Sequence, residues 1–252
     1  MTRTRRATVA MLLVGLAIFS SLYSTQAILP TLVHNMGLSS TEAAMTVSAA
    51  TGALALCVVP ASILSERFGR GRILLISAVA ATGVGLIVPL AQEGWQLIAV
   101  RGLQGALLSG APATAMAWLS EELDDKALPR AMGLYIAGTS VGGLTGRLIP
   151  TGLVEISTWR WALFGSALVS LAFAITSWLL LPTQRNFRPK SIHLKTESRA
   201  LLGHWANRDL ALLFLTAFLS MGTFVSMYNF LTFRLIDDFG LAPSLAGLAF
   251  LF

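Results

Sequence analysis

Apolar segments long enough to cross a membrane recur along this chain and constrain its fold more than any other feature. A helix needs roughly 20 mostly apolar residues to span the hydrocarbon core of a bilayer, and several segments reach that length. Only 12% of the 252 residues are charged, whereas an average soluble domain has about 25%. The pattern predicts an all-α, polytopic membrane protein and excludes most soluble enzymes and disordered chains.

The apolar segments form two unequal groups around a polar stretch. Six helices are expected before it, over residues 7–33, 41–64, 73–91, 95–119, 128–154 and 159–181. A seventh helix over 209–236 and an eighth apolar segment over 243–252 follow it. We therefore expect a six-helix transmembrane bundle over 1–181, a cytoplasmic linker over 182–208 and the start of a second bundle over 209–252.

The eighth segment is too short for a complete span. The ten residues of 243–252 rise only about 15 Å as a helix, half of a bilayer core. We therefore expect the sequence to be the front part of a longer protein that supplies the rest of the second bundle. The alternative is that this segment is a short re-entrant or interfacial helix.

Lysine and arginine are distributed unevenly between alternate loops. Of the 18, fourteen lie in the N-terminus, in the loops after the second and fourth helices and in the central stretch, and two lie in loops on the opposite side. Because cytoplasmic loops carry the excess of basic residues, we expect the N-terminus and the central stretch to lie in the cytoplasm. This asymmetry accounts for the net charge of +6, so no nucleic-acid partner is expected.

Metal-ligating and redox-active residues are scarce. Cys57 is the only cysteine, and His34, His193 and His204 all fall in loops. No disulfide, metal site or cofactor is therefore expected.

A short internal similarity predicts a parallel repeat. Ser21–Ser24 reads Ser-Leu-Tyr-Ser and Ser226–Asn229 reads Ser-Met-Tyr-Asn, and a glycine follows each tyrosine by fourteen and twelve residues. Transporters built from such repeats bind substrate between the halves near the midplane. Polar residues in and just after these copies are candidates to bind substrate, or else they are interfacial residues satisfied by their neighbours. They are Tyr23, Tyr228 and Asn229 within the copies, and Gln26, an uncharged hydrogen-bonding residue three positions after Tyr23.

The loop after the second helix carries the first family motif. Residues 62–72 read Ser-Ile-Leu-Ser-Glu-Arg-Phe-Gly-Arg-Gly-Arg, which resembles the major facilitator superfamily signature G-x-L-A-D-R-x-G-R-[RK]. Glu66 stands where the family has Asp, and Arg67, Gly69 and Arg70 match. The resemblance implies a gating loop whose acid faces the positive end of a helix in the other half and holds the cytoplasmic side closed.

The fourth helix carries an arginine within its span. Arg101, Gln104 and Gly105 are similar to the R-x-x-x-G pattern that the family has on this helix, often with the glutamine. The resemblance implies that Arg101 and Gln104 take part in proton or substrate coupling. The alternative is that Arg101, close to Trp95, extends its side chain to the outer interface.

The fifth helix is rich in glycine. Its residues 138–147 resemble the antiporter signature G-x-x-x-G-P-x-x-G-G, with Gly143 in place of proline and Arg147 in place of the last glycine. Glycines spaced by four share one helix face and allow close helix packing, and the resemblance adds a role in the direction of transport. Arg147 either lines the cavity or extends to the interface. The glycines are Gly138, Gly142, Gly143 and Gly146.

Together these motifs resemble those of a secondary active transporter of the major facilitator superfamily, most similar to its bacterial inner-membrane branch of drug and sugar exporters. The resemblance implies a multi-pass protein of the inner (plasma) membrane. The resemblance implies proton-coupled efflux of a small solute by alternating access, with protons, the lipid bilayer and a C-terminal half or second copy as partners. Few charges lie in the spans, so a neutral or amphipathic solute is favoured. No carboxylate lies mid-span, which leaves uniport open. The alternative is a non-transporting half-transporter or scaffold; an enzyme is not expected.

Overall fold

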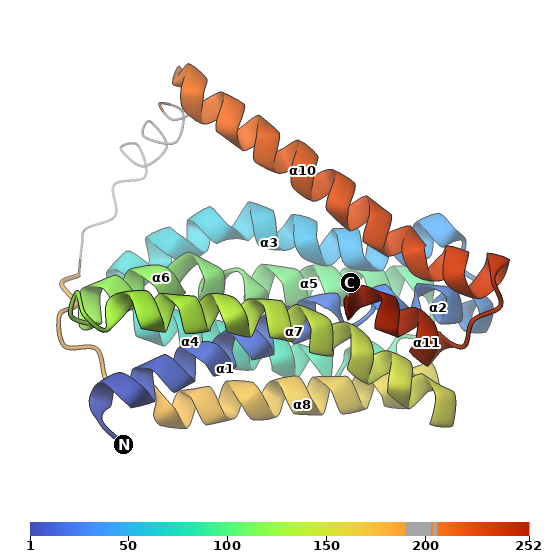
Figure 1. Ribbon diagram of the computed structural model, residues 1–252, viewed down its shortest axis with the longest axis horizontal. Helices are drawn as coiled ribbons and strands as arrows, with labels where there is room; N and C mark the ends of the chain where they lie inside the picture. The colour runs from blue at the N-terminus through green and yellow to red at the C-terminus, as the bar shows by residue number, and fades with distance from the viewer. Residues whose placement is uncertain (190–202, 204–205, 252) are drawn as a thin grey trace.

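The computed structural model describes residues 1–189, 203 and 206–251, and every element within them is helical (Figure 1). Most of the linker expected over 182–208 lies outside these residues. The α-helices are α1 (Arg3–Tyr23), α2 (Leu29–Met36), α3 (Ser40–Phe68), α4 (Arg70–Gly85), α5 (Gly94–Leu108), α6 (Gly110–Glu122), α7 (Leu128–Ile156), α8 (Trp159–Leu180), α10 (Arg208–Phe233) and α11 (Pro243–Leu248). The shorter helical turns are η1 (Gln26–Ile28), η2 (Val88–Leu90), η3 (Arg234–Asp238) and η4 (Ala249–Leu251).

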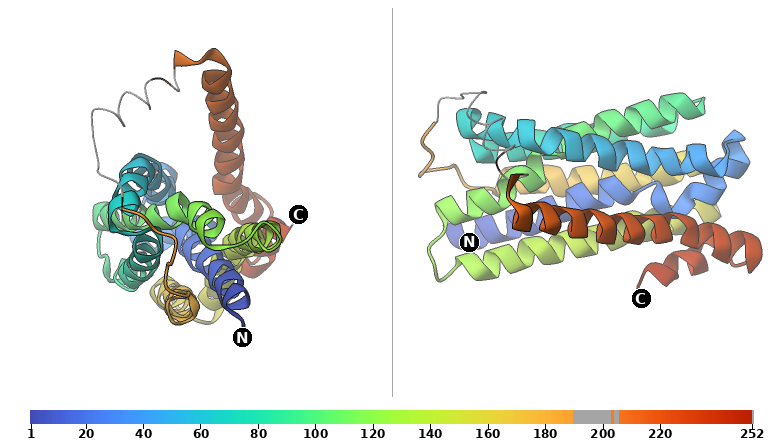
Figure 2. Two further views of the ribbon diagram at one scale, coloured as in Figure 1. Left: turned by 90° about the vertical axis from the view of Figure 1, so that its left-hand side faces the viewer. Right: turned by 90° about the horizontal axis from the view of Figure 1, so that it is seen from above.

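The helices α1 to α8 run lengthwise through one bundle (Figures 1 and 2). α1 packs along α7 and α8, and α3 packs along α5. The N-terminus, the α3–α4 turn, the α6–α7 connection and the end of α8 lie at one end of this bundle. The connections that are rich in lysine and arginine therefore lie together at one end of the described bundle, as expected from their positions in alternate loops.

Five helical stretches in the described part of the chain are long and apolar enough to cross a membrane. They are Arg3–Met36, Ser40–Phe68, Arg70–Leu90, Trp159–Leu180 and Arg208–Asp238. Two further expected spans, over 95–119 and 128–154, also run through the bundle as α5 with α6 and as α7 (Figure 1). The first is divided into two shorter helices, and the second carries the buried Arg147.

The first expected helix is not continuous, and Pro30 gives the reason. α1 ends at Tyr23, and the chain passes through η1 before α2 resumes with the proline in its first turn. Proline has no N–H to donate to the carbonyl four residues earlier, and its ring collides with that carbonyl. The helix is thus interrupted around Gln26.

The fourth expected helix is divided in the same way. α5 ends at Leu108 and α6 begins at Gly110, two residues before Pro112. The proline removes the hydrogen bond to the carbonyl of Leu108. The hydroxyl of Ser77 on α4 donates to the neighbouring carbonyl of Leu107, so the break is partly satisfied from another helix.

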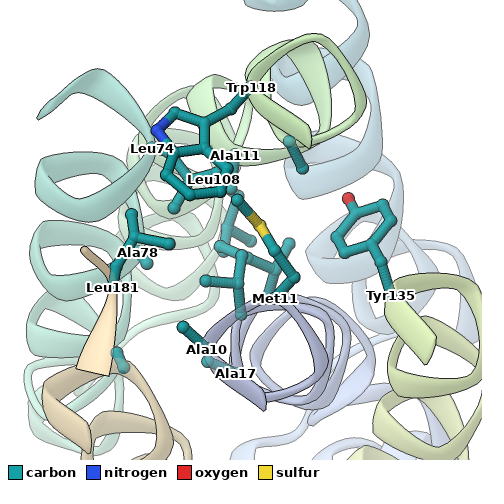
Figure 3. Packing of buried hydrophobic residues seen from close by; sticks show 14 of the residues in the cluster. Ala10, Met11, Ala17, Leu74, Ala78, Leu108, Ala111, Trp118, Tyr135 and Leu181 are labelled. Atoms are coloured by element: carbon teal, nitrogen blue, oxygen red, sulfur yellow. The ribbon is translucent and has the colours of Figure 1, made fainter. Parts of the chain in front are cut away.

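The core of the bundle combines small and large side chains (Figure 3). Alanines on α1, α4 and α6 let the helices approach closely, and a few large side chains fill the remaining space. Met11 and Trp118 are fully buried within this cluster.

α10 contacts the bundle only through its C-terminal part (Figures 1 and 2). There it packs against α2, η1 and α11, and Asn229 and Thr232 are its buried residues. α11 packs against α7. The junction of α10 and α11 with α7 and η1 positions the candidate site.

Candidate functional site

Arg147 and all four predicted substrate-binding residues converge at the break in the first helix. Gln26 lies in η1, Tyr23 ends α1, Arg147 is on α7, and Tyr228 and Asn229 are on α10. The Nε atom of Arg147 donates to Oε1 of Gln26 at 2.8 Å. The amide nitrogen of Gln26 donates to Oδ1 of Asn229 at 2.6 Å. The two halves of the proposed repeat thus contribute to one polar cluster.

Aromatic rings surround the Arg147 guanidinium. Its central carbon lies 4.2 Å from the ring centre of Tyr23, 5.2 Å from that of Tyr228 and 5.1 Å from that of Phe250. Nη1 donates to the carbonyl of Gly143 at 2.8 Å. With 7% of its surface exposed, Arg147 is held inside the protein and does not extend to the bundle surface.

A cavity of about 300 Å³ opens beside this guanidinium. Its wall is largely aromatic, and it includes residues that the sequence did not single out. Phe224 precedes Tyr228 by one helical turn, and their rings stack with centres 4.3 Å apart, so the i, i+4 spacing on α10 was an available signal. The lining residues are Phe19, Tyr23, Thr139, Ser140, Gly143, Leu144, Arg147, Phe224, Tyr228 and Phe250.

Arg101 occupies a separate and fully buried site on α5. Nη1 donates to the carbonyl of Ser21 at 2.9 Å, and Nη2 donates to the carbonyl of Leu22. Nε donates to the carbonyl of Thr46 at 3.2 Å. The last carbonyls of a helix lack partners within it, so Arg101 caps the interrupted end of α1. This geometry rules out extension to the outer interface.

Gln104 completes the Arg101 site. Its Oε1 accepts from Nη1 of Arg101 at 2.6 Å, and its Nε2 donates to the hydroxyl of Ser21 at 2.7 Å and to the carbonyl of Ala81 at 3.1 Å. The two predicted coupling residues therefore lie together and hold α1, α4 and α5 around the break. Their role in coupling stays a prediction.

The predicted gating loop lies at the basic end of the bundle. Nε of Arg70 donates to Glu121 on α6 at 2.6 Å, and Nη2 lies 3.5 Å from Glu66. Gly69 has φ of 101° between α3 and α4, a conformation that favours glycine. Arg67 lies 5.4 Å from the ring centre of Phe68. The loop therefore contacts the C-terminal end of α6 through Arg70. Its gating role stays a prediction.

The predicted glycine row of α7 faces α1. A Cβ atom added to Gly142 would lie 2.8 Å from the carbonyl oxygen of Gly15, and one added to Gly146 would lie 2.5 Å from that of Ser20. A Cβ on Gly138 would collide with the carbonyl of Leu12. Gly143 faces the guanidinium of Arg147 instead. The row therefore sets the closest approach of two helices.

Comparisons with known proteins agree with this architecture. The family model of the Major Facilitator Superfamily matches residues 11–252. The chain is 36% identical to the inner membrane transport protein YnfM of Escherichia coli (strain K12), over 92% of this chain and 55% of that protein. It is 32% identical to YybF, an uncharacterised MFS-type transporter of Bacillus subtilis (strain 168), over 92% of this chain and 57% of that protein.

The fold is also similar to a solved structure. The crystal structure of a bacterial homologue of the human lysosomal transporter Spinster superimposes with a TM-score of 0.79 at 15% identity, over 99% of this chain and 59% of that one. The chain therefore spans little more than half the length of the proteins it matches. Its sequence, helical architecture and motifs agree, and the chain belongs to the Major Facilitator Superfamily.

Proposed function

We propose that this protein is the N-terminal part of a proton-coupled secondary transporter that exports a small solute, drug-like or sugar-like, by alternating access. The convergence of Arg147, Gln26 and Asn229 carries the proposal. These side chains come from α7, from the break in the first helix and from α10, which begins the second bundle. A site built from both bundles changes its access when the bundles move against each other.

The two arginine sites share the break in the first helix, which supports a coupled mechanism. Arg101 holds the carbonyls of Ser21 and Leu22. Four residues after Leu22, Gln26 holds Arg147. A movement of this segment reaches both sites. We propose that proton movement is linked to solute movement through it, with Gln104 fixing the orientation of Arg101.

The gating loop has a different place in this proposal. Glu66 and Arg70 pair at the junction of α3 and α4. This junction lies at the basic end of the bundle, whereas α10 and α11 contact the bundle towards its other end (Figure 1). We propose that they close the cytoplasmic side against the C-terminal half. The basic connections gathered at that end, together with the name of the inner membrane relative, support an inner membrane location with the N-terminus in the cytoplasm.

Reconstituted vesicles test transport directly. The protein purified from its native membrane is placed in liposomes that hold a pH-sensitive dye, and a pH gradient is imposed. Sugars and drug-like solutes are then added one at a time. At least one solute is expected to cause a proton flux and to move against its own gradient. If no member of the panel moves protons or accumulates, the protein is a scaffold and the transport proposal is wrong.

Orientation needs its own measurement. A single cysteine placed before Arg3, in a background in which Cys57 is replaced by serine, is expected to resist a membrane-impermeant maleimide in intact cells and to react in inverted vesicles. A cysteine at exposed Ile156, at the other end of α7, is the matched control and is expected to react in intact cells. The opposite pattern would reverse the proposed orientation.

A further inference from the structure

We propose that the Arg147 cavity binds the anionic group of an amphipathic organic anion, with an aromatic carboxylate as the simplest example. The proposal rests on the transport function above in one respect, namely that this cavity is the solute site. Among the drug-like and sugar-like solutes proposed there, it selects drug-like solutes that carry a negative charge. Of the neutral and amphipathic solutes that the low charge of the spans favours, it selects the amphipathic ones.

The charge of Arg147 is not compensated within the described chain. Its hydrogen-bond acceptors there are the amide of Gln26 and the carbonyl of Gly143, both neutral. Arg70, in contrast, donates to the carboxylate of Glu121, and Arg3 pairs with Glu122. Burying a charge without an opposite charge is energetically unfavourable. An anion in the cavity would supply the missing opposite charge.

The geometry of the guanidinium leaves donors for that anion. An arginine side chain has five N–H groups in one planar fork. Arg147 uses one on Nε and one on Nη1 within the described residues, so the remaining donors include the pair on Nη2. A carboxylate accepts two parallel hydrogen bonds from such a fork. Arg147 is one of the residues that line the cavity.

Half of the ten residues that line the cavity are aromatic, and Thr139 and Ser140 add hydroxyl groups, so the walls suit a flat aromatic body that carries a polar group. Tyr23, Tyr228 and Phe250 surround the guanidinium within 5.2 Å, and Phe224 stacks on Tyr228. The faces of the rings attract the cation, but by less than the cost of burying it. They also offer faces on which an aromatic solute packs. A volume of about 300 Å³ lies at the lower end for small-molecule sites.

Arg101 provides the contrast that singles out Arg147. It is completely buried, and its three guanidinium nitrogens all donate to backbone or side-chain oxygens that hold the helix break. A side chain used in this way has little capacity left for a solute. The two arginines thus have separate tasks, one in the frame of the bundle and one facing the cavity.

Three probes of nearly equal shape test the proposal. Benzoate, benzamide and benzamidine carry a negative, a neutral and a positive group on the same ring. Each is titrated against the protein purified from its native membrane, and the thermal midpoint gives an apparent Kd because a ligand that binds the folded state raises it. Benzoate is expected to bind at least ten-fold more tightly than benzamide, and benzamidine is expected not to bind.

Variants locate the binding. Arg147→Gln is expected to weaken benzoate at least ten-fold and to leave benzamide unchanged, and Arg147→Lys to restore part of the affinity. Gln26→Glu places a carboxylate beside Nε of Arg147 and is expected to weaken benzoate to a similar extent. This variant decides the question if Arg147→Gln fails to fold, since a glutamate keeps the acceptor at that position. Asn35→Ala, a change at an exposed residue of α2, is the control.

The outcomes separate the anion site from transport. Equal binding of benzoate and benzamide, absence of benzoate binding, or benzoate binding that survives both Arg147→Gln and Gln26→Glu would each overturn the proposal. The second outcome would mean that an acid elsewhere in the whole protein already pairs with Arg147. If benzoate binds as expected but no solute moves in the vesicles, transport is wrong and the anion site stands. If a neutral solute moves while benzoate does not bind, the transport proposal stands and the anion site is wrong.

Discussion

Arg147 and Gln26 are joined by a 2.8 Å hydrogen bond, and the same glutamine donates to Asn229, 203 residues further along the chain. One amide therefore connects α7, η1 and α10. Its oxygen satisfies a buried cation and its nitrogen satisfies a buried amide oxygen. This side chain is therefore a buried polar contact between α10 and the bundle.

Replacing Gln26 with leucine is expected to destabilise the protein more than replacing Asn229 with leucine. The first change leaves two buried groups without partners, whereas the second leaves one, and each unsatisfied group costs about 1–3 kcal/mol. The thermal midpoints of the two purified variants measure the difference. Equal midpoints would show that water or another side chain replaces the amide.

Replacing Arg101 with alanine is expected to lower stability by about 1–3 kcal/mol, because the buried carbonyls of Ser21, Leu22 and Thr46 each lose a charged donor. Arg101→Lys keeps the charge but has a single nitrogen, so it is expected to lose an intermediate amount. Midpoints and transport are both measured and transport is expressed per folded molecule. A stable alanine variant without transport would assign Arg101 to coupling and not to the frame.

The sequence was sufficient to predict the helical class, the approximate spans and five of the residues that meet at the candidate site, namely Tyr23, Gln26, Arg147, Tyr228 and Asn229. Hydrophobic length determines the first two. The similarity between Ser21–Ser24 and Ser226–Asn229 indicated Tyr23, Tyr228 and Asn229 as site residues, because equivalent positions of a repeat face the same central region. The family is confirmed by the match over residues 11–252.

The helix breaks and the contacts of the two arginines were not predictable from the sequence. Pro30 and Pro112 follow interruptions, whereas Pro60 and Pro150 lie inside continuous helices. Whether a proline breaks a helix depends on which neighbours satisfy the freed carbonyls, and these come from distant segments. The contribution of Phe250 to the Arg147 site likewise depends on tertiary packing.

The α1–α7 interface predicts a position-specific effect of adding one methyl group. Gly142→Ala is expected to cost about 1–3 kcal/mol, because the new Cβ would lie within 2.9 Å of backbone atoms of Gly15 and Leu16. Gly133→Ala and Gly152→Ala on the same helix meet nothing within 4 Å and are the matched controls. They are expected to be neutral or stabilising by up to about 1 kcal/mol. Similar losses at all three positions would contradict close packing at Gly142.

The ion pair between Arg70 and Glu121 predicts an energetic coupling between the α3–α4 turn and α6. The side chains are 13% and 32% exposed and their atoms lie 2.6 Å apart. A partly exposed pair of this kind is worth about 1 kcal/mol. Arg70→Ala and Glu121→Ala are therefore expected to destabilise less together than the sum of their separate effects.

A double-mutant cycle on the purified protein measures this coupling. Gln184 strengthens the expectation, because its Nε2 donates to Glu121 and its Oε1 accepts from the backbone of Gly71, so it orients the carboxylate toward Arg70. The control is Arg67→Ala, because Arg67 contacts the ring of Phe68 and is expected to show no coupling to Glu121. Additive losses for Arg70 and Glu121 would mean that their contact contributes no net stability.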